Sequence, residues 1–298
     1  MKTKICLFVG PTLFREPTPA GIVRYGPAAL GSVFRAVEAG YRRIGVVDGF
    51  FGNAPSVWHK EILYAISRGV DVAGAGSMGA LRAAELWTLG MVGLGRIFRL
   101  FRSGAWTDDD EVAVIHATKE LDFQPVSEAM ANVRFTLRSL TRKGVLERRL
   151  EQEIVRRMKA FHFSGRTKEA LRQQLIELVG RAKGEEVVDR FEREFVDAKR
   201  QDARVLVRYL TGPRAKPWPR ASKVFSPTDH WRGQFETEIA HRNAGRQPLP
   251  NQAHGDLRHQ HLAAVRERHD ARGAVDAAAE EIVVATLVKT DVHSAANR

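Results

Sequence analysis

The chain has 298 residues, 44% of them hydrophobic and 28% charged, and its formal net charge is +12 at pH 7. This composition is ordinary for a globular protein, and the single cysteine, Cys6, excludes a disulfide framework and a cysteine-based zinc site. The positive charge indicates an acidic partner, such as nucleic acid, a membrane surface or an acidic protein, or else a solvated helical surface. We expect no membrane-spanning segment and a cytoplasmic location.

The first 120 residues alternate between short apolar runs and stretches with helical periodicity. The apolar runs predict strands over residues 5–9, 44–47, 70–73 and 112–115. The amphipathic stretches predict helices over residues 28–39, 53–68, 78–89 and 94–101. Such alternation is typical of βαβ crossovers. We therefore predict an α/β fold, with a small doubly wound parallel sheet of about four strands and helices on both faces.

After residue 126 the periodicity is only helical. It predicts helices over residues 127–143, 146–161, 168–179, 185–199 and 204–210. From Gly212 the sequence becomes rich in Pro, His, Asn and Gln, which indicates a basic tail of low order, although residues 274–288 are compatible with a final helix. The expected domains are an α/β core (1–126), an all-helical C-terminal extension packed on it (127–211) and the tail (212–298).

Residues 74–85 read GAGSMGALRAAE and follow the third predicted strand. Gly74, Gly76 and Gly79 match the G-x-G-x-x-G pattern of dinucleotide-binding proteins, but that pattern belongs after the first strand. It also needs an acidic residue at the end of the next strand, where this chain has His116. A phosphate-binding loop needs lysine where Ala80 stands. Nucleotide cofactors are therefore disfavoured, and no cofactor is expected for this chain.

The same residues also resemble a nucleophile elbow, in which Ser77 lies between a strand and a helix. Such a turn raises the hydroxyl above the carboxyl end of the strand, beside N–H groups that stabilise an oxyanion. Asp48 after the second strand and His59 on the following helix supply the other members of a triad. We name Ser77, His59 and Asp48 as catalytic candidates. The alternative is a glycine-rich turn whose serine only caps the helix.

Other polar residues have ordinary explanations as well. Arg82 and Glu85 are three residues apart and predict an intrahelical ion pair. The run at 108–111, with Asp108, Asp109 and Glu111, is a possible acidic site. Consecutive carboxylates do not all face one ion and no phosphate loop accompanies them, so no metal is expected.

Six stretches of this sequence resemble the TfuA family. They are VGPTL (9–13), VVDGFFG (46–52), VWHKEIL (57–63), SMGALRAAEL (77–86), DDDEVAV (108–114) and SEAM (127–130), the last followed by Asn132 and Arg134. The resemblance covers about residues 5–165. It implies a partner of YcaO enzymes, which use ATP to activate a backbone amide of a peptide or protein, so that sulfur replaces oxygen in a thioamide.

The activity implied by the resemblance is hydrolysis of the C-terminal thiocarboxylate of a ThiS-like ubiquitin-fold sulfur carrier, which releases sulfide to the YcaO enzyme. Recruitment of that enzyme is implied as well. Lys60 and Arg82 are candidates to bind the anionic tail, with Glu85, Gly76, Gly79 and His116 completing the binding site. Two alternatives remain: a non-catalytic adaptor of the YcaO enzyme, and a nucleic-acid-binding protein. The second is disfavoured because the charge comes with no stacking platform or known binding motif.

Overall fold

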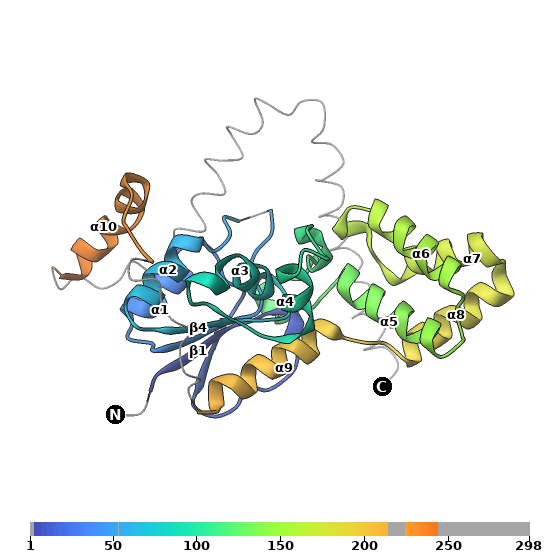
Figure 1. Cartoon of the computed structure of the whole chain (residues 1–298), viewed down its shortest axis with the longest axis horizontal. Coiled ribbons are helices and arrows are strands. Elements are labelled where there is room, and N and C mark those ends of the chain that lie inside the picture. Colours follow the sequence, from blue (N-terminus) through green and yellow to red (C-terminus); the bar gives the residue numbers. More distant parts are fainter. Residues whose placement is uncertain (1–2, 53, 214–223, 244–298) are drawn as a thin grey trace. The chain divides into compact units, whose positions relative to one another are not determined.

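The computed structural model describes residues 3–52, 54–213 and 224–243 (Figure 1). The chain divides into two compact units, Met1–Thr228 and Asp229–Arg298. In the second unit the described part is one helix, α10 (Asp229–Asn243), which lies within the segment expected to be of low order. The possible helix over residues 274–288 lies outside the described residues. Among the helices that are described, none combines the length and the apolar character needed to cross a bilayer.

The centre of the first unit is a parallel sheet of five strands in the order β2-β1-β3-β4-β5. The strands predicted over residues 5–9, 44–47 and 70–73 are confirmed to within a residue or so, as β1, β3 and β4. The α/β fold class is confirmed too, with five strands where about four were expected. The five strands are β1 (Ile5–Phe8), β2 (Ile22–Tyr25), β3 (Arg43–Val46), β4 (Asp71–Gly74) and β5 (Val92–Gly93).

The strand predicted over residues 112–115 is wrong. The acidic run before it forms a single 3-10 turn, η3 (Asp109–Glu111), and the chain then continues without joining the sheet. Val112 is fully buried in the cluster of apolar side chains around the helices, and the N–H of Ile115 donates to Ser127 Oγ at 2.8 Å. Apolar residues in sequence therefore mark burial here, but not membership of the sheet.

Helices cover both faces of the sheet (Figure 1). On one face, Cys6, Phe8 and Ile44 pack in a cluster with residues of α1 (Ser32–Glu38), α2 (His59–Ser67), α3 (Met78–Leu86) and α4 (Gly95–Arg102). On the other face, Leu7 and Val47 pack with residues of α9 (Ala198–Thr211), the last helix of the first unit. The alternation of side chains along each strand thus fills two separate cores.

Four further helices form a core of their own, with Leu137, Ile154, Leu175 and Phe191 at its centre. All were predicted, but α8 ends at Arg193, where the sequence pattern indicated Lys199. Lys199 therefore belongs to the start of α9, which places it at the sheet. The four helices are α5 (Met130–Arg142), α6 (Arg148–Ala160), α7 (Lys168–Val179) and α8 (Arg181–Arg193). The remaining 3-10 turns are η1 (Pro11–Leu13), η2 (Trp87–Leu89), η4 (Lys119–Leu121) and η5 (Phe163–Gly165).

Glu61 explains part of the WHKEIL motif in structural terms. Its side chain is fully buried, and its two carboxylate oxygens accept hydrogen bonds from the N–H groups of Val33 and Phe34 and from that of Trp58. The first two N–H groups belong to the first turn of α1. Glu61 therefore fixes the start of α2 to the start of α1.

Candidate functional site

The three glycines of the GAGSMG turn allow α3 to lie directly on the sheet. A Cβ atom on Gly74 would lie 2.0 Å from the carbonyl oxygen of Gly79, and one on Gly79 would lie 1.8 Å from that of Val46. Both distances are too short for any side chain. The spacing that resembles a dinucleotide pattern is therefore accounted for by close packing of α3 against β3 and β4.

Gly76 places Ser77 at the carboxyl end of β4. Its φ of +73° is in the left-handed region, and a Cβ atom there would lie 2.9 Å from the carbonyl oxygen of Lys199. Ser77 is 2% exposed, and its Oγ donates to the carbonyl oxygen of Val112 at 3.4 Å. Ser77 stands at the N-cap of α3, but its side chain makes no capping hydrogen bond in the described structure. Helix capping therefore does not explain the serine.

Two backbone N–H groups of this turn are already bonded. That of Ser77 donates to the carbonyl oxygen of Ala75 at 2.8 Å, and that of Gly79 donates to the carbonyl oxygen of Val47 at 3.0 Å. These two groups are thus engaged in holding the turn and the helix in place. An oxyanion at Ser77 would have to use other donors or displace these bonds.

Asp48 lies at the carboxyl end of β3 and is 2% exposed. One carboxylate oxygen accepts hydrogen bonds from the N–H groups of Gly10 at 2.9 Å and Thr12 at 3.0 Å. The other accepts a hydrogen bond from the hydroxyl of Thr12 at 2.6 Å. Asp48 therefore holds the turn that follows β1. Its position at the strand end agrees with the expectation that polar residues gather at this edge of the sheet.

Lys199 is a member of the site that the sequence did not indicate. Its side chain is 3% exposed, and Nζ donates to the carbonyl oxygen of Val112 at 2.7 Å. Burial lowers the pKa of Lys199 below its usual range, although the negative charges of Asp48, Asp197 and Glu128 act to raise it. Burial likewise raises the pKa of Glu128 to about 7.

His59, Arg82 and Glu85 form a separate group on the surface of α2 and α3. Nε2 of His59 lies 2.7 Å from a carboxylate oxygen of Glu85, and the guanidinium of Arg82 donates to the same oxygen at 2.9 Å. The predicted ion pair between Arg82 and Glu85 is thus confirmed. Burial raises the pKa of Glu85, but the bonds from His59 and Arg82 outweigh it and hold the pKa below its ordinary value.

The three catalytic candidates therefore have different partners. Ser77 bonds to Val112, His59 to Glu85, and Asp48 to the turn after β1. Among the described residues, no hydrogen bond joins any two of the three. The remaining candidates are also engaged elsewhere: Nζ of Lys60 donates to the carbonyl oxygen of Ser226 at 2.8 Å, and Nδ1 of His116 lies 2.8 Å from the carbonyl oxygen of Ala117.

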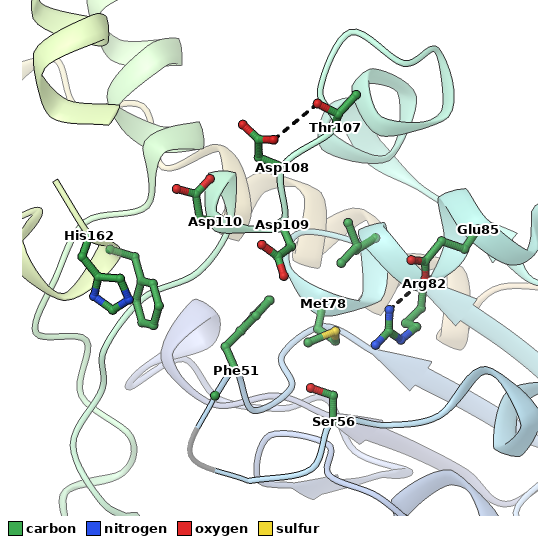
Figure 2. Close-up of a pocket in the computed structure, with 13 residues that line it drawn as sticks. Phe51, Ser56, Met78, Arg82, Glu85, Thr107, Asp108, Asp109, Asp110 and His162 are labelled. Atoms are coloured by element: carbon green, nitrogen blue, oxygen red, sulfur yellow. Dashed lines mark hydrogen bonds and ion pairs between the residues drawn. The ribbon is translucent and has the colours of Figure 1, made fainter. Parts of the chain in front are cut away.

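An open cleft of about 790 Å³ lies beside the start of α3 (Figure 2). Its walls come from the segment before α2, from α3, from residues 107–110 and from the turn at 162–163. Met78, the residue after Ser77, lines it. Aromatic, cationic and acidic side chains also face it, among them Phe51, Arg82, Asp109, His162 and Phe163.

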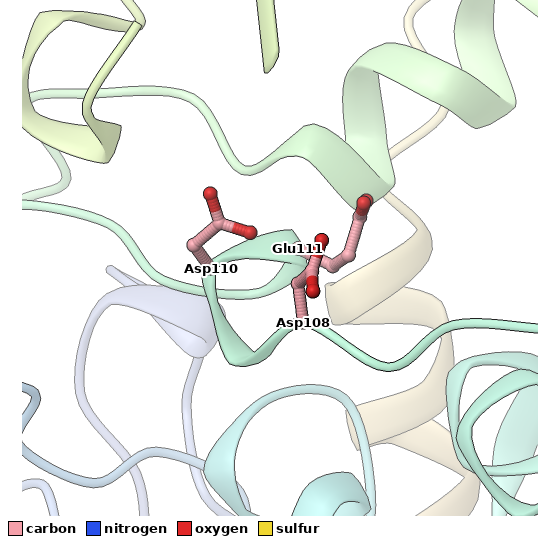
Figure 3. A group of neighbouring side chains, drawn as sticks. All are labelled: Asp108, Asp110 and Glu111. Carbon is pink, nitrogen blue, oxygen red and sulfur yellow. The ribbon is translucent and has the colours of Figure 1, made fainter. Parts of the chain in front are cut away.

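The acidic run forms a cluster in which Asp108, Asp110 and Glu111 have carboxylate oxygens within 4.8 Å of one another (Figure 3). The ammonium group of Lys159 contacts all three, at 3.2 Å from Asp108 and 3.1 Å from Glu111. Lys159 thus stands where a cation would bind. Asp109, which was predicted with this site, faces the cleft instead. In addition, Arg134 binds Glu111 and Arg166 binds Asp110.

Fold and site together define an α/β protein with a buried serine at the carboxyl edge of a parallel sheet, next to an open cleft. Residues 48–167 match the family model described as TfuA-like protein, so this part of the chain is similar to that family. The match includes Asp48, His59, Ser77, the acidic cluster and Glu128, whereas Lys199 lies beyond it. None of the curated proteins compared with the chain is similar to it.

Proposed function

We propose that this protein supports backbone thioamidation by a YcaO enzyme, and that it does so by hydrolysing the C-terminal thiocarboxylate of a ThiS-like sulfur carrier. The TfuA-like match supports the partnership in general terms. The observation that carries the chemistry is Ser77, which lies at the carboxyl end of β4 and bears a hydroxyl that caps no helix. Strand ends of this kind are where α/β proteins place their reacting groups.

The reaction needs only water as a second substrate. Attack at the thiocarboxyl carbon breaks the C–S bond, the sulfur leaves with the bonding electrons as hydrosulfide, and the carrier ends in a carboxylate. The cleft beside Met78 provides an approach for a narrow chain end. Arg82 lines the cleft and Lys60 lies on the adjoining helix, so both are placed to attract an acidic carrier.

Sulfide release from thiocarboxylated carrier, with this protein alone, tests the proposal. We expect release by the unaltered protein and a loss on the order of 10²-fold or more in Ser77→Ala, because the nucleophile is removed. Ser103→Ala is the matched control, since Ser103 lies at the end of α4 and its hydroxyl bonds only to the carbonyl oxygen of Leu100 among the described contacts. Near-normal release by folded Ser77→Ala would show that Ser77 is not the nucleophile.

A second candidate function is that of a non-catalytic adaptor. The observation in its favour is burial: Ser77 and Asp48 are each 2% exposed, whereas His59 and Glu85 lie on the surface. An adaptor binds the YcaO enzyme or the carrier but releases no sulfide by itself. The same assay, run with and without the YcaO enzyme, separates the two functions, because an adaptor increases release only when the enzyme is present.

A further inference from the structure

The segment from the end of α3 to the acidic run carries positive charge only. Residues 86–107 include Arg96, Arg99 and Arg102 and no Lys, His, Asp or Glu. All three arginines belong to α4 and are spaced three residues apart, so they lie along one side of the helix over about 9 Å. Arg99 and Arg102 are exposed and Arg96 is half-buried. We refer to these three side chains as the α4 arginine row.

Among the described residues, no carboxylate forms an ion pair with the α4 arginine row. Arg96 donates to the side-chain oxygen of Gln201, which is uncharged. The carboxylate of Asp202 acts on the row from below, but it is 3% exposed and accepts the N–H of Ile97 at 2.8 Å, so it is directed at the backbone of α4. On α7, by contrast, Arg172 is paired with glutamates. The outward charge of the row therefore favours binding of a negatively charged surface.

Aromatic rings hold two of the guanidinium groups in place. That of Arg102 lies 5.2 Å from the ring centroid of Trp87 and 5.7 Å from that of Phe98. That of Arg96 lies over Phe135 at 4.5 Å. Such cation–π contacts orient the side chains in advance, which reduces the rotamer freedom that is lost when a partner binds. Arginine and tryptophan are also among the residues that carry most of the binding energy at protein interfaces.

The segment that carries the row also forms part of the cleft. Glu85 precedes the segment and Thr107 ends it, and both line the cleft. Trp106, next to Thr107, packs on Phe101 of α4 with ring centroids 5.9 Å apart. In addition, α3 and α4 pack against each other (Figure 1). A folded partner bound on the row therefore has the cleft beside it.

We propose that the α4 arginine row is the docking site for the folded body of an acidic carrier protein, whose chain end enters the cleft. The identity of the carrier rests on the proposed function, whereas its binding to α4 can be measured without turnover. An acidic protein fits the row better than nucleic acid does. Guanidinium groups cover a face of Trp87 and of Phe135, on which bases would otherwise stack. Three charges over about 9 Å also match a few surface carboxylates, whereas binding to duplex DNA typically engages about six to ten phosphates.

Carrier binding to a charge-reversed variant tests this docking site. The probe is the ThiS-like carrier ending in a carboxylate, so that no sulfide can be released, and isothermal titration calorimetry with the full-length protein gives Kd. We expect Arg99→Glu/Arg102→Glu to raise Kd about tenfold or more, because like charges then face each other across the interface. The matched control is Arg142→Glu/Arg149→Glu, which makes the same change in net charge at exposed arginines of α5 and α6. It should bind the carrier nearly as well as the unaltered protein.

Equal Kd values for the two double variants would overturn the docking site, because net charge and not the α4 arginine row would then determine binding. Failure of the unaltered protein to bind the carrier would overturn it too. If the charge-reversed variant does not fold by circular dichroism, Arg99→Gln/Arg102→Gln replaces it and should raise Kd severalfold. Loss of duplex DNA binding in the row variant, with carrier binding intact, would assign the row to nucleic acid instead.

Sulfide release separates the docking site from the proposed function. With thiocarboxylated carrier, the row variant should show a raised KM and an unchanged kcat, because the reacting groups are untouched. Binding that depends on the row, without any sulfide release by the unaltered protein, would support the docking site and contradict the hydrolysis. Sulfide release with the same KM in the row variant would support the hydrolysis and overturn the docking site.

Discussion

Burial has opposite effects on the reactivity of the Cys6 thiol and the Lys199 amine. Both side chains are almost entirely shielded from water, and in each case burial favours the neutral form. For an amine the neutral form is the base, whereas for a thiol it is the unreactive form. Burial raises the pKa of the Cys6 thiol to about 12, so Cys6 is a poor sulfur acceptor.

We therefore predict that Cys6→Ser keeps the sulfide-releasing activity. The free energy of unfolding should fall by about 1–3 kcal/mol, because a hydroxyl replaces the thiol within an apolar cluster. Urea unfolding measures the stability, and Cys6→Ala serves as the control that brings in no polar group. Transfer of labelled sulfur to Cys6 during turnover would instead support a persulfide relay.

The residues of the site were predictable to different degrees. Asp48 and Ser77 follow directly after strands, and the carboxyl ends of parallel strands lie along one edge, so their common location follows from the sequence pattern. The pairing of His59 with Glu85 depends on how α2 packs on α3, which no local pattern specifies. Lys199 comes from a helix far along the chain, and only the tertiary fold places it beside Ser77.

At the scale of elements, strands were predictable where a run of apolar residues is buried on both faces. β3 and β4 are buried throughout and were found. β2, at the edge of the sheet, alternates between residues that are buried or half-buried and residues that are exposed, and β5 is only two residues long, so neither has a distinct apolar run. Residues 112–115 have such a run but do not join the sheet, and the one-dimensional pattern does not distinguish the two cases.

The contact between Gly76, in the turn before α3, and the start of α9 leads to a prediction at the scale of elements. Gly76 and Gly104 both have a φ of +73°, but a Cβ atom would clash with Lys199 at Gly76 and would have nothing within 4 Å at Gly104. Gly104→Ala should therefore cost about 1 kcal/mol from backbone strain alone, and Gly76→Ala clearly more. Urea unfolding of both variants measures the difference. Equal losses would mean that α9 shifts freely and does not constrain the turn.

At the scale of the whole first unit, Lys159 joins the helical region to the α/β core. It lies at the end of α6 and its ammonium group contacts three carboxylates of the segment before Val112. Although burial raises the pKa of Asp110, hydrogen bonds from Lys159 and Arg166 outweigh it and hold the pKa below its ordinary 3.8. A carboxylate with a lowered pKa stabilises the folded state above its ordinary pKa and loses that effect as pH falls.

Lys159→Met should therefore lower the free energy of unfolding by about 3 kcal/mol at pH 7, because three clustered carboxylates lose their shared cation. The difference from the unaltered protein should decrease as pH is lowered through and below 3.8, where Asp110 takes up a proton. Urea unfolding at a series of pH values tests both statements. Lys183→Met, which breaks an exposed ion pair, should change stability by less than about 1 kcal/mol.

The positive charge of the chain after α9 is concentrated in one short stretch. Residues 212–228 contain four basic residues and no acidic one, whereas residues 229–298 contain nine Lys or Arg and ten Asp or Glu. The end of this stretch also contacts the core: Phe225 packs on Tyr64 with ring centroids 5.3 Å apart, and Ser226 accepts the bond from Lys60. The described end of this stretch, residues 224–228, thus belongs to the first unit, Met1–Thr228.

A chain ending at Thr228 should therefore melt within a few degrees of the full-length protein, whereas one ending at Pro213 should melt lower because the contacts of Phe225 and Ser226 are lost. A thermal melt of the two truncated chains measures the difference.

The positive charge of residues 212–228 also predicts an effect on the rate of association with an acidic partner. The rate of binding to an acidic carrier at low salt should be unchanged by removal of residues 229–298, because their charges nearly cancel. It should fall severalfold when Arg214, Lys216, Arg220 and Lys223 are all changed to Gln, and the difference should shrink at high salt as screening increases. Stopped-flow binding at two salt concentrations measures it, and an equal rate for the four-Gln variant at low salt would show that this stretch does not attract the carrier.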